Sequence, residues 1–234
     1  RCECRRLLCN KFFIGLLAVL LFYAGQVFYA VALPGVAHTA PFSPWSFGAY
    51  LGRLLPLVWV GALFFLTFFT SARERRAAVL TAATPADPRR YALARCAAAL
   101  VGVALLCLAA LALAALLYAR LFGWTDWGSL ALPALVILAP PLVFALGSGW
   151  LLGRLRPWLL YVWMLLPFAL AALPLPEALG LWNGGLCTSY PLTLGMLDPA
   201  FSLPAAAWAV QGLLLAAGVL LLLVAGKGKK VYNQ

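Results

Sequence analysis

The sequence predicts an all-α, polytopic membrane protein: a single transmembrane domain over residues 1–234, with six transmembrane helices and both termini in the cytoplasm. Two observations predict this class. Hydrophobic residues make up 65% of the chain and charged residues 10%, with a mean hydropathy of +0.99, which leaves too little polar surface to cover a soluble globule. The apolar residues also gather in runs of about 20, enough for a helix to cross about 30 Å of hydrocarbon.

Six apolar runs are predicted to be spans: residues 12–33, 54–70, 91–118, 129–152, 158–173 and 205–225. The first resembles a cleavable signal peptide, but it exceeds the roughly 7 to 15 apolar residues of such a segment, so we expect an uncleaved span. The third would cover about 42 Å, which implies that it tilts or projects beyond the hydrocarbon. Pro133, Pro140 and Pro141 predict a kink or an interruption in the fourth.

Basic residues orient these spans, because Lys and Arg are retained in short cytoplasmic loops. With a cytoplasmic N-terminus, 15 of the 17 basic residues fall inside, and only Arg53 and Arg120 fall outside. The net charge of +11 is therefore a topology signal. Because the basic residues are scattered over short loops and tails, without a single basic face, we expect no nucleic-acid partner.

Polar chemistry inside the spans is sparse. No acidic residue lies within the six runs, and Arg95 is expected to be the only charge there, close enough to the cytoplasmic end to extend its head group into water. Ion-coupled carriers place Asp, Glu or His near the midplane. Any energy for transport should therefore come from another subunit.

The chain carries no expected catalytic residue, metal site or cofactor of its own. The basic stretch 226–230 lacks the Ser or Thr and the preceding strand of a phosphate-binding loop. The only histidine, His38, falls in an outer loop. Ser148, between Gly147 and Gly149, would need an activating base to act as an intramembrane nucleophile, and small residues at helix contacts explain this triplet more simply. The spacing of the three cysteines in the N-terminal tail matches no familiar metal site; these are Cys2, Cys4 and Cys9.

A basic segment, residues 71–95, separates the second and third runs. Its first part, 71–84, is rich in Ala, Arg, Glu and Leu and favours a short cytoplasmic helix. Pro85 ends that helix, and Asp87 with Pro88 can begin the next one. A solvated loop whose arginines enforce topology and touch anionic lipid is the alternative.

This segment resembles the loop between the second and third spans of type-2 ABC transporter permeases. The resemblance rests on residues 72–76 (A-R-E-R-R), 79–85 (V-L-T-A-A-T-P) and 89–95 (R-R-Y-A-L-A-R), although Ala77 and Ala78 stand where the family often has Gly-Thr. It implies the permease subunit of an ATP-binding cassette exporter in a bacterial cytoplasmic membrane. Such a subunit pairs with a second permease copy or a homologous permease, and a separate ATPase subunit, which binds ATP and Mg, docks on the coupling loop 71–90.

The resemblance also assigns roles to residues. The ATPase-coupling residues would be Arg73, Glu74, Arg75, Arg76, Leu80, Thr84 and Pro85. The cytoplasmic segment 1–11 would lie at the membrane interface. Its three cationic residues there, Arg5, Arg6 and Lys11, would bind anionic headgroups. The outer loop 174–204 would form short re-entrant helices that close an outer gate with Trp182 and Tyr190. An interfacial loop anchored by the same two side chains is the alternative.

Two other function classes stay open. A non-transporting assembly factor or scaffold could bind a cytoplasmic partner through the same loop. An intramembrane enzyme or an ion-coupled carrier is disfavoured by the missing acids and histidines. Polar groups in the spans are few, chiefly Thr67, Ser148 and Gln211, which favours a hydrophobic or amphipathic cargo such as a peptide, a drug or a lipid.

Overall fold

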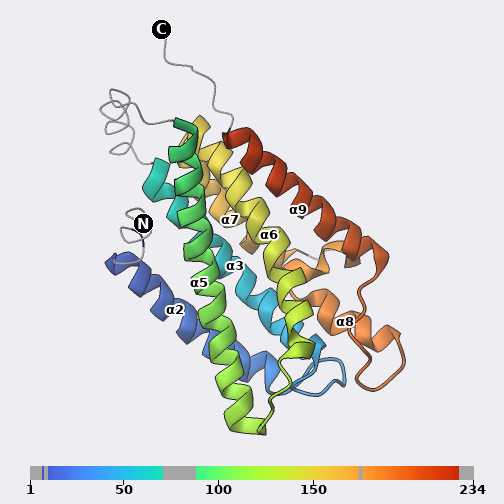
Figure 1. Cartoon of the computed structure of the whole chain (residues 1–234). Coiled ribbons are helices and arrows are strands. Elements are labelled where there is room, and N and C mark those ends of the chain that lie inside the picture. Colours follow the sequence, from blue (N-terminus) through green and yellow to red (C-terminus); the bar gives the residue numbers. More distant parts are fainter. Residues whose placement is uncertain (1–6, 8–9, 71–87, 174–175, 227–234) are drawn as a thin grey trace.

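The computed structural model describes residue 7 and residues 10–70, 88–173 and 176–226, and within them every regular element is helical. Figure 1 shows a bundle of long helices with shorter helices at one end. In chain order the elements are α2 (Lys11–Val27), the π-helical turn η1 (Phe28–Ala32), α3 (Pro44–Thr70), α5 (Pro88–Phe122), α6 (Gly128–Leu155), α7 (Trp158–Ala172), the 3₁₀-helix η2 (Glu177–Trp182), α8 (Gly185–Thr193) and α9 (Ala205–Gly226).

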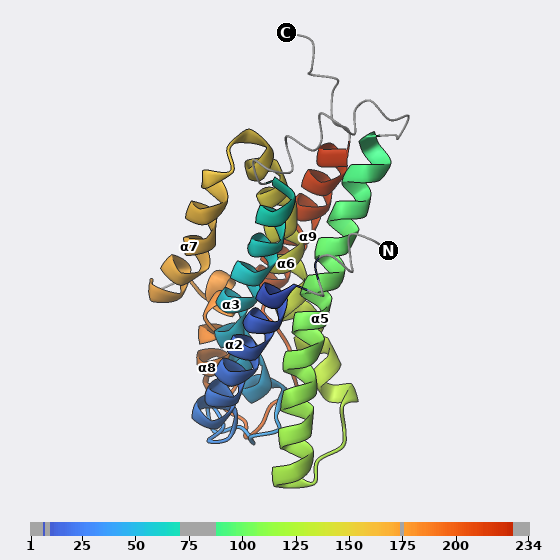
Figure 2. The same cartoon turned by 90° about the vertical axis from the view of Figure 1, so that its left-hand side faces the viewer.

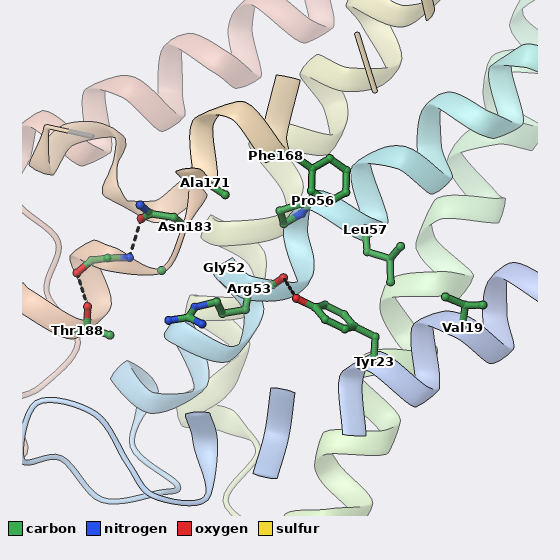
Figure 3. Close-up of a pocket in the computed structure, with 12 residues that line it drawn as sticks. Val19, Tyr23, Gly52, Arg53, Pro56, Leu57, Phe168, Ala171, Asn183 and Thr188 are labelled. Atoms are coloured by element: carbon green, nitrogen blue, oxygen red, sulfur yellow. Dashed lines mark hydrogen bonds between the residues drawn. The ribbon is translucent and has the colours of Figure 1, made fainter. Parts of the chain in front are cut away.

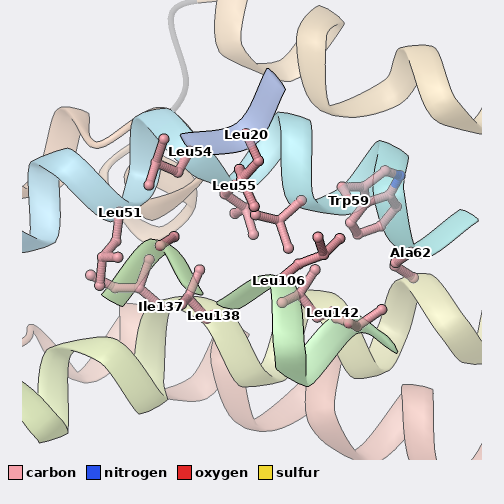
Figure 4. Close-up of a cluster of buried hydrophobic side chains, with 14 of the residues drawn as sticks. Leu20, Leu51, Leu54, Leu55, Trp59, Ala62, Leu106, Ile137, Leu138 and Leu142 are labelled. Carbon is pink, nitrogen blue, oxygen red and sulfur yellow. The ribbon is translucent and has the colours of Figure 1, made fainter. Parts of the chain in front are cut away.

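Helix α3 is the centre of the bundle and contacts α2, α5, α6, α7 and α8. Its large side chains are buried along nearly its whole length, from Trp45 and Tyr50 to Trp59 and Phe65. Figure 4 shows aliphatic side chains of α2, α5 and α6 converging on it. The outer faces of the flanking helices are apolar too, with Phe22 72% exposed, for example. A bundle that is apolar both inside and outside suits a hydrocarbon solvent.

The helices alternate in direction. α3, α6 and α9 run one way, while α5 and α7 run the other way (Figures 1 and 2). One end of the bundle, which we call the Thr70 end, therefore holds the end of α3, the start of α5 and the junction of α6 with α7. The opposite end, the Pro44 end, holds the start of α3 and the short helix α8.

Within the residues that the structure describes, five helices are long and apolar enough to cross a membrane: Lys11–Ala32, Pro44–Thr70, Ala94–Phe122, Gly128–Leu155 and Ala205–Val224. The described part of the chain is therefore all-helical, and its long apolar helices indicate a multi-pass membrane protein. Six spans were expected, but α7 has 15 residues and covers only about 22 Å. The second span was expected to begin at Leu54, but α3 starts ten residues earlier, at Pro44.

Small residues let α6 approach its neighbours closely. A Cβ built on Gly147 would lie 2.5 Å from the Gly218 carbonyl oxygen of α9, and one built on Gly149 would lie 2.4 Å from Leu63 of α3. The packing explanation for this glycine pair therefore agrees with the structure. The prolines of α6 do not interrupt it, since the helix is continuous from Gly128 to Leu155.

We expect the substitution Gly218→Ala to destabilise the bundle. The added Cβ would lie 2.6 Å from the Phe144 backbone nitrogen, so α6 and α9 must separate, at a cost of about 1–3 kcal/mol in unfolding free energy. Thermal denaturation of the purified protein in detergent measures the effect. Gly212→Ala is the matched control, because nothing lies within 4 Å of that position on the same helix. Equal melting temperatures for the two variants would contradict this packing.

Candidate functional site

The coupling residues expected from the sequence lie outside the described residues, as do two of the three headgroup-binding residues: Arg73, Glu74, Arg75, Arg76, Leu80, Thr84, Pro85, Arg5 and Arg6. The third, Lys11, is the first residue of α2 and is exposed. The structure does describe the residues that flank the loop. Two of them form a contact between α3 and α5 at the base of the loop.

This contact joins Arg95 of α5 to Phe69 of α3. The Arg95 Nη1 donates a hydrogen bond of 3.3 Å to the Phe69 carbonyl oxygen, and its guanidinium carbon lies 5.6 Å from the centre of the Phe69 ring. Carbonyls in the last turn of a helix lack helical donors and carry partial negative charge, so a cation is stabilised there. The expectation that Arg95 extends into water is wrong. Its side chain is buried, because the end of α3 supplies an acceptor.

At the Pro44 end, η2 and α8 fold back onto α3. Gly184 adopts a left-handed conformation (φ 74°), and a Cβ there would lie 2.9 Å from the Ala49 carbonyl oxygen. On the facing side, a Cβ on Gly52 would lie 2.6 Å from the Gly184 nitrogen, and one on Gly48 would lie 2.8 Å from the Cys187 sulfur. The two glycines, four residues apart on one face of α3, therefore permit backbone contact with the turn before α8.

Trp182 and Tyr190 both pack toward α3. The Trp182 ring is 3% exposed and lies 5.2 Å from the Trp59 ring, while the Tyr190 ring lies 5.8 Å from the Trp45 ring. An interfacial anchor would keep its indole at the surface, so the interfacial alternative does not describe Trp182. Sequence reasoning could not place this side chain, because its burial depends on η2 returning to the middle of α3.

A cavity of about 660 Å³ opens beside this contact (Figure 3). Three helices line it, together with the turn before α8 and the first residues of α8. The lining residues are Val19 and Tyr23 of α2; Gly52, Arg53, Pro56 and Leu57 of α3; Phe168 and Ala171 of α7; Asn183 and Gly184 of the turn; and Gly185 and Thr188 of α8. The Tyr23 hydroxyl donates to the Arg53 carbonyl oxygen at 3.4 Å, which links α2 to α3 at its edge. Its volume is in the range of small-molecule sites, about 300–1,000 Å³.

Arg53 is the charged side chain of this cavity, and its position corrects the sequence analysis. The expected span began after it, which placed Arg53 in an outer loop and left Arg95 as the only charge within a span. In the structure Arg53 lies inside the continuous helix α3. The sequence does carry a signal for the start of α3: Ser43 is followed by Pro44, and these residue types are preferred at the N-cap and at the first helical position. The Ser43 hydroxyl accepts a hydrogen bond of 3.4 Å from the Trp45 amide.

The buried polar side chains of the spans offer no catalytic pair among the described residues. The Ser148 hydroxyl donates to the Phe144 carbonyl oxygen at 2.6 Å and accepts from the Trp163 indole at 2.9 Å, and an indole N–H cannot act as a base. Gln211 of α9 is 3% exposed, and its amide has no hydrogen-bond partner in the described part of the chain. The same part holds no cluster of three potential metal ligands.

Comparison of the chain with protein-family models, curated proteins and solved structures finds no match.

Cys187 tests the packing of α8 on α3. Its thiol is buried, and burial raises the pKa of this thiol to about 12. Since the thiolate is the reactive form, we expect N-ethylmaleimide to label Cys187 at least about tenfold more slowly than an exposed cysteine between pH 7 and 9. Peptide mass spectrometry after timed labelling measures this rate.

The substitution Ser189→Cys supplies the control, because position 189 is on the same helix and is exposed. Comparable labelling of both cysteines in the folded protein would mean that α8 does not rest on α3.

Proposed function

We propose that this chain is the membrane-spanning permease subunit of an ABC exporter in a bacterial cytoplasmic membrane. A separate ATPase subunit docks on residues 71–90 and supplies the energy, and a second permease copy or a homologous permease completes the pathway. The proposal rests on the resemblance of the loop sequence to type-2 permeases, and the all-helical bundle is compatible with it. In this proposal α7 is a further, shorter membrane segment beside the five long helices, and η2 and α8 belong to the outer loop.

The structural observation that supports the proposal is the contact between Arg95 and Phe69 at the base of the loop. The hydrogen bond of 3.3 Å connects the end of α3 to the start of α5, so a partner that pushes on residues 71–90 displaces both helices together. α3 is the central helix of the bundle. A load applied at the loop therefore reaches the buried core directly.

The distribution of charge supports a cytoplasmic position for the Thr70 end. Arg95 lies near the start of α5, Arg154 is in the last turn of α6, and Arg156 follows it directly. Cationic residues concentrate on the cytoplasmic side of membrane proteins. The loop 71–90 then faces the compartment that holds ATP.

Charge and apolar contacts in the loop can be tested separately. The first step is to isolate the complex from native membranes and identify an ATPase with a Walker loop and an ABC signature. We expect Leu80→Asp and Glu74→Ala to weaken co-purification of this ATPase, or to lower transport-coupled ATP hydrolysis in proteoliposomes, by about tenfold, the effect of losing about 1.4 kcal/mol of interaction.

Arg76→Ala and Arg156→Ala form a matched pair, since each removes one arginine and only the first lies in the loop. Hydrolysis that falls equally in both variants would indicate a general loss of positive charge. Wild-type complex formation and hydrolysis in all of the loop variants would refute the coupling assignment. A partner that binds this loop without hydrolysing ATP would favour the scaffold.

Arg95→Gln tests transmission separately from docking. This substitution removes the charge that interacts with the end of α3, and a hydrogen bond to a charged group contributes about 1.5–3 kcal/mol. We expect the ATPase still to co-purify, while substrate-stimulated hydrolysis falls severalfold and the melting temperature drops. Arg120→Gln, at the other end of α5, should change neither quantity. Unchanged hydrolysis in Arg95→Gln would mean that this contact only stabilises the fold.

A further inference from the structure

We infer that the cavity between α2, α3, α7 and α8 binds the headgroup of an anionic phospholipid, with Arg53 as its charged contact. This inference does not rest on the proposed transport function, because it concerns what the cavity binds in any state of the protein. Three features of the cavity lead to it: a cation with no side-chain partner among the described residues, a side-chain amide that is fixed in orientation, and an exposed apolar wall.

The cation comes first. The Arg53 guanidinium makes no hydrogen bond or ion pair with any residue that the structure describes, and only its backbone carbonyl is engaged, by Tyr23. An arginine in a membrane helix is stabilised by pairing with an anion or by reaching the interface. Phosphate is a preferred partner of the planar guanidinium, which can donate two parallel hydrogen bonds to it.

The second feature is Asn183, in the turn before α8. Its side-chain oxygen accepts a hydrogen bond of 2.8 Å from the Gly185 amide, which fixes the orientation of the group. Its NH₂ is left without a protein acceptor among the described residues, and Asn183 lines the cavity. The lining of the cavity therefore holds a charged donor on α3 and, in the turn before α8, an amide donor that the described protein does not use, and phosphate oxygens can accept from both kinds of group.

The third feature is the apolar wall, which selects a lipid over a soluble anion. Val19 of α2 and Phe168 of α7 line the cavity and are 56% and 48% exposed. They come from two different helices that border the cavity (Figure 3), and their exposure places this apolar wall at the outer surface of the bundle. A soluble anion gains nothing from these side chains. The acyl chains of a phospholipid bury them at about 25 cal/mol per Å².

The depth of Arg53 agrees with a headgroup. Arg53 precedes Thr70 by 17 residues of continuous helix, about 25 Å along its axis. If the hydrocarbon begins near Thr70 and is about 30 Å thick, Arg53 lies a few ångströms inside the opposite boundary. The phosphate of a lipid in that leaflet is within reach of the long arginine side chain.

Lipid binding to the delipidated full-length protein tests this inference. Native mass spectrometry would follow titration with dioleoylphosphatidylglycerol and, separately, dioleoylphosphatidylcholine, which share acyl chains and differ in net charge. We expect the first bound phosphatidylglycerol to bind about tenfold more tightly than phosphatidylcholine, a factor that corresponds to about 1.4 kcal/mol. Arg53→Gln should abolish this preference, and Arg53→Lys should retain part of it.

Arg120→Gln is the matched control, since it removes an exposed arginine outside the cavity, and it should keep the preference. Ala171→Trp fills the cavity while leaving Arg53 in place and should also weaken phosphatidylglycerol binding, which keeps the test decisive if Arg53→Gln folds poorly. Inorganic phosphate should not displace the lipid.

Three results would overturn the inference. The first is an unchanged preference in both Arg53→Gln and Ala171→Trp. The second is full displacement of phosphatidylglycerol by inorganic phosphate, which would indicate a site for soluble anions. The third is a change of oligomeric state in Arg53→Gln without a change in lipid preference, which would indicate that a second copy of the chain covers the cavity.

Discussion

The burial of α3 at the centre of the bundle is the constraint on which the other contacts depend. A central helix in hydrocarbon must satisfy its own polar groups internally, because no water is present to do so. Two of its tryptophans meet this requirement through other elements: the Trp45 indole donates to the Pro199 carbonyl at 2.7 Å, and the Trp59 indole donates to the Trp163 carbonyl at 3.2 Å. These bonds attach the segment before α9 and the helix α7 to α3.

Glycines determine how close the neighbours of α3 can come, and the same closeness shapes the cavity. Gly52 brings the turn before α8 into backbone contact, and the next residue along α3 is Arg53. Because α8 occupies the Gly52 face, the Arg53 side chain projects beside it into the space that α2 and α7 leave open (Figure 3). A larger residue at position 52 would displace the turn that carries Asn183. The glycine contact and the polar donors of the cavity are therefore one structural unit.

Much of the fold could be predicted from the sequence, because long apolar runs specify helices through composition alone. The ends of α6 and α9 were expected within three residues. The start of α3 was not, since Gly48, Gly52 and Arg53 lower the local hydropathy of a segment that is helical through its packing. The candidate site was largely beyond prediction for the same reason. The partner of Arg95 and the burial of Trp182 both arise from contacts between elements distant in sequence, which composition and spacing do not encode.

Two cations, Arg95 and Arg53, lie near opposite ends of α3, and their surroundings differ. Arg95 interacts with a carbonyl in the last turn of α3. The guanidinium of Arg53, about 25 Å away along the helix, makes no hydrogen bond or ion pair with any described residue. About four turns of α-helix separate Pro56 from Thr70. Pro56 itself lines the cavity and deprives the Gly52 carbonyl of its helical donor. If an ATPase acts on residues 71–90, the rigid part of α3 carries the displacement as far as Pro56, and the weakened turn there allows the Arg53 side to respond differently. A bound anion at Arg53 would then oppose the bending if it binds the straight form of α3 more tightly. It would favour the bending if it binds the bent form more tightly.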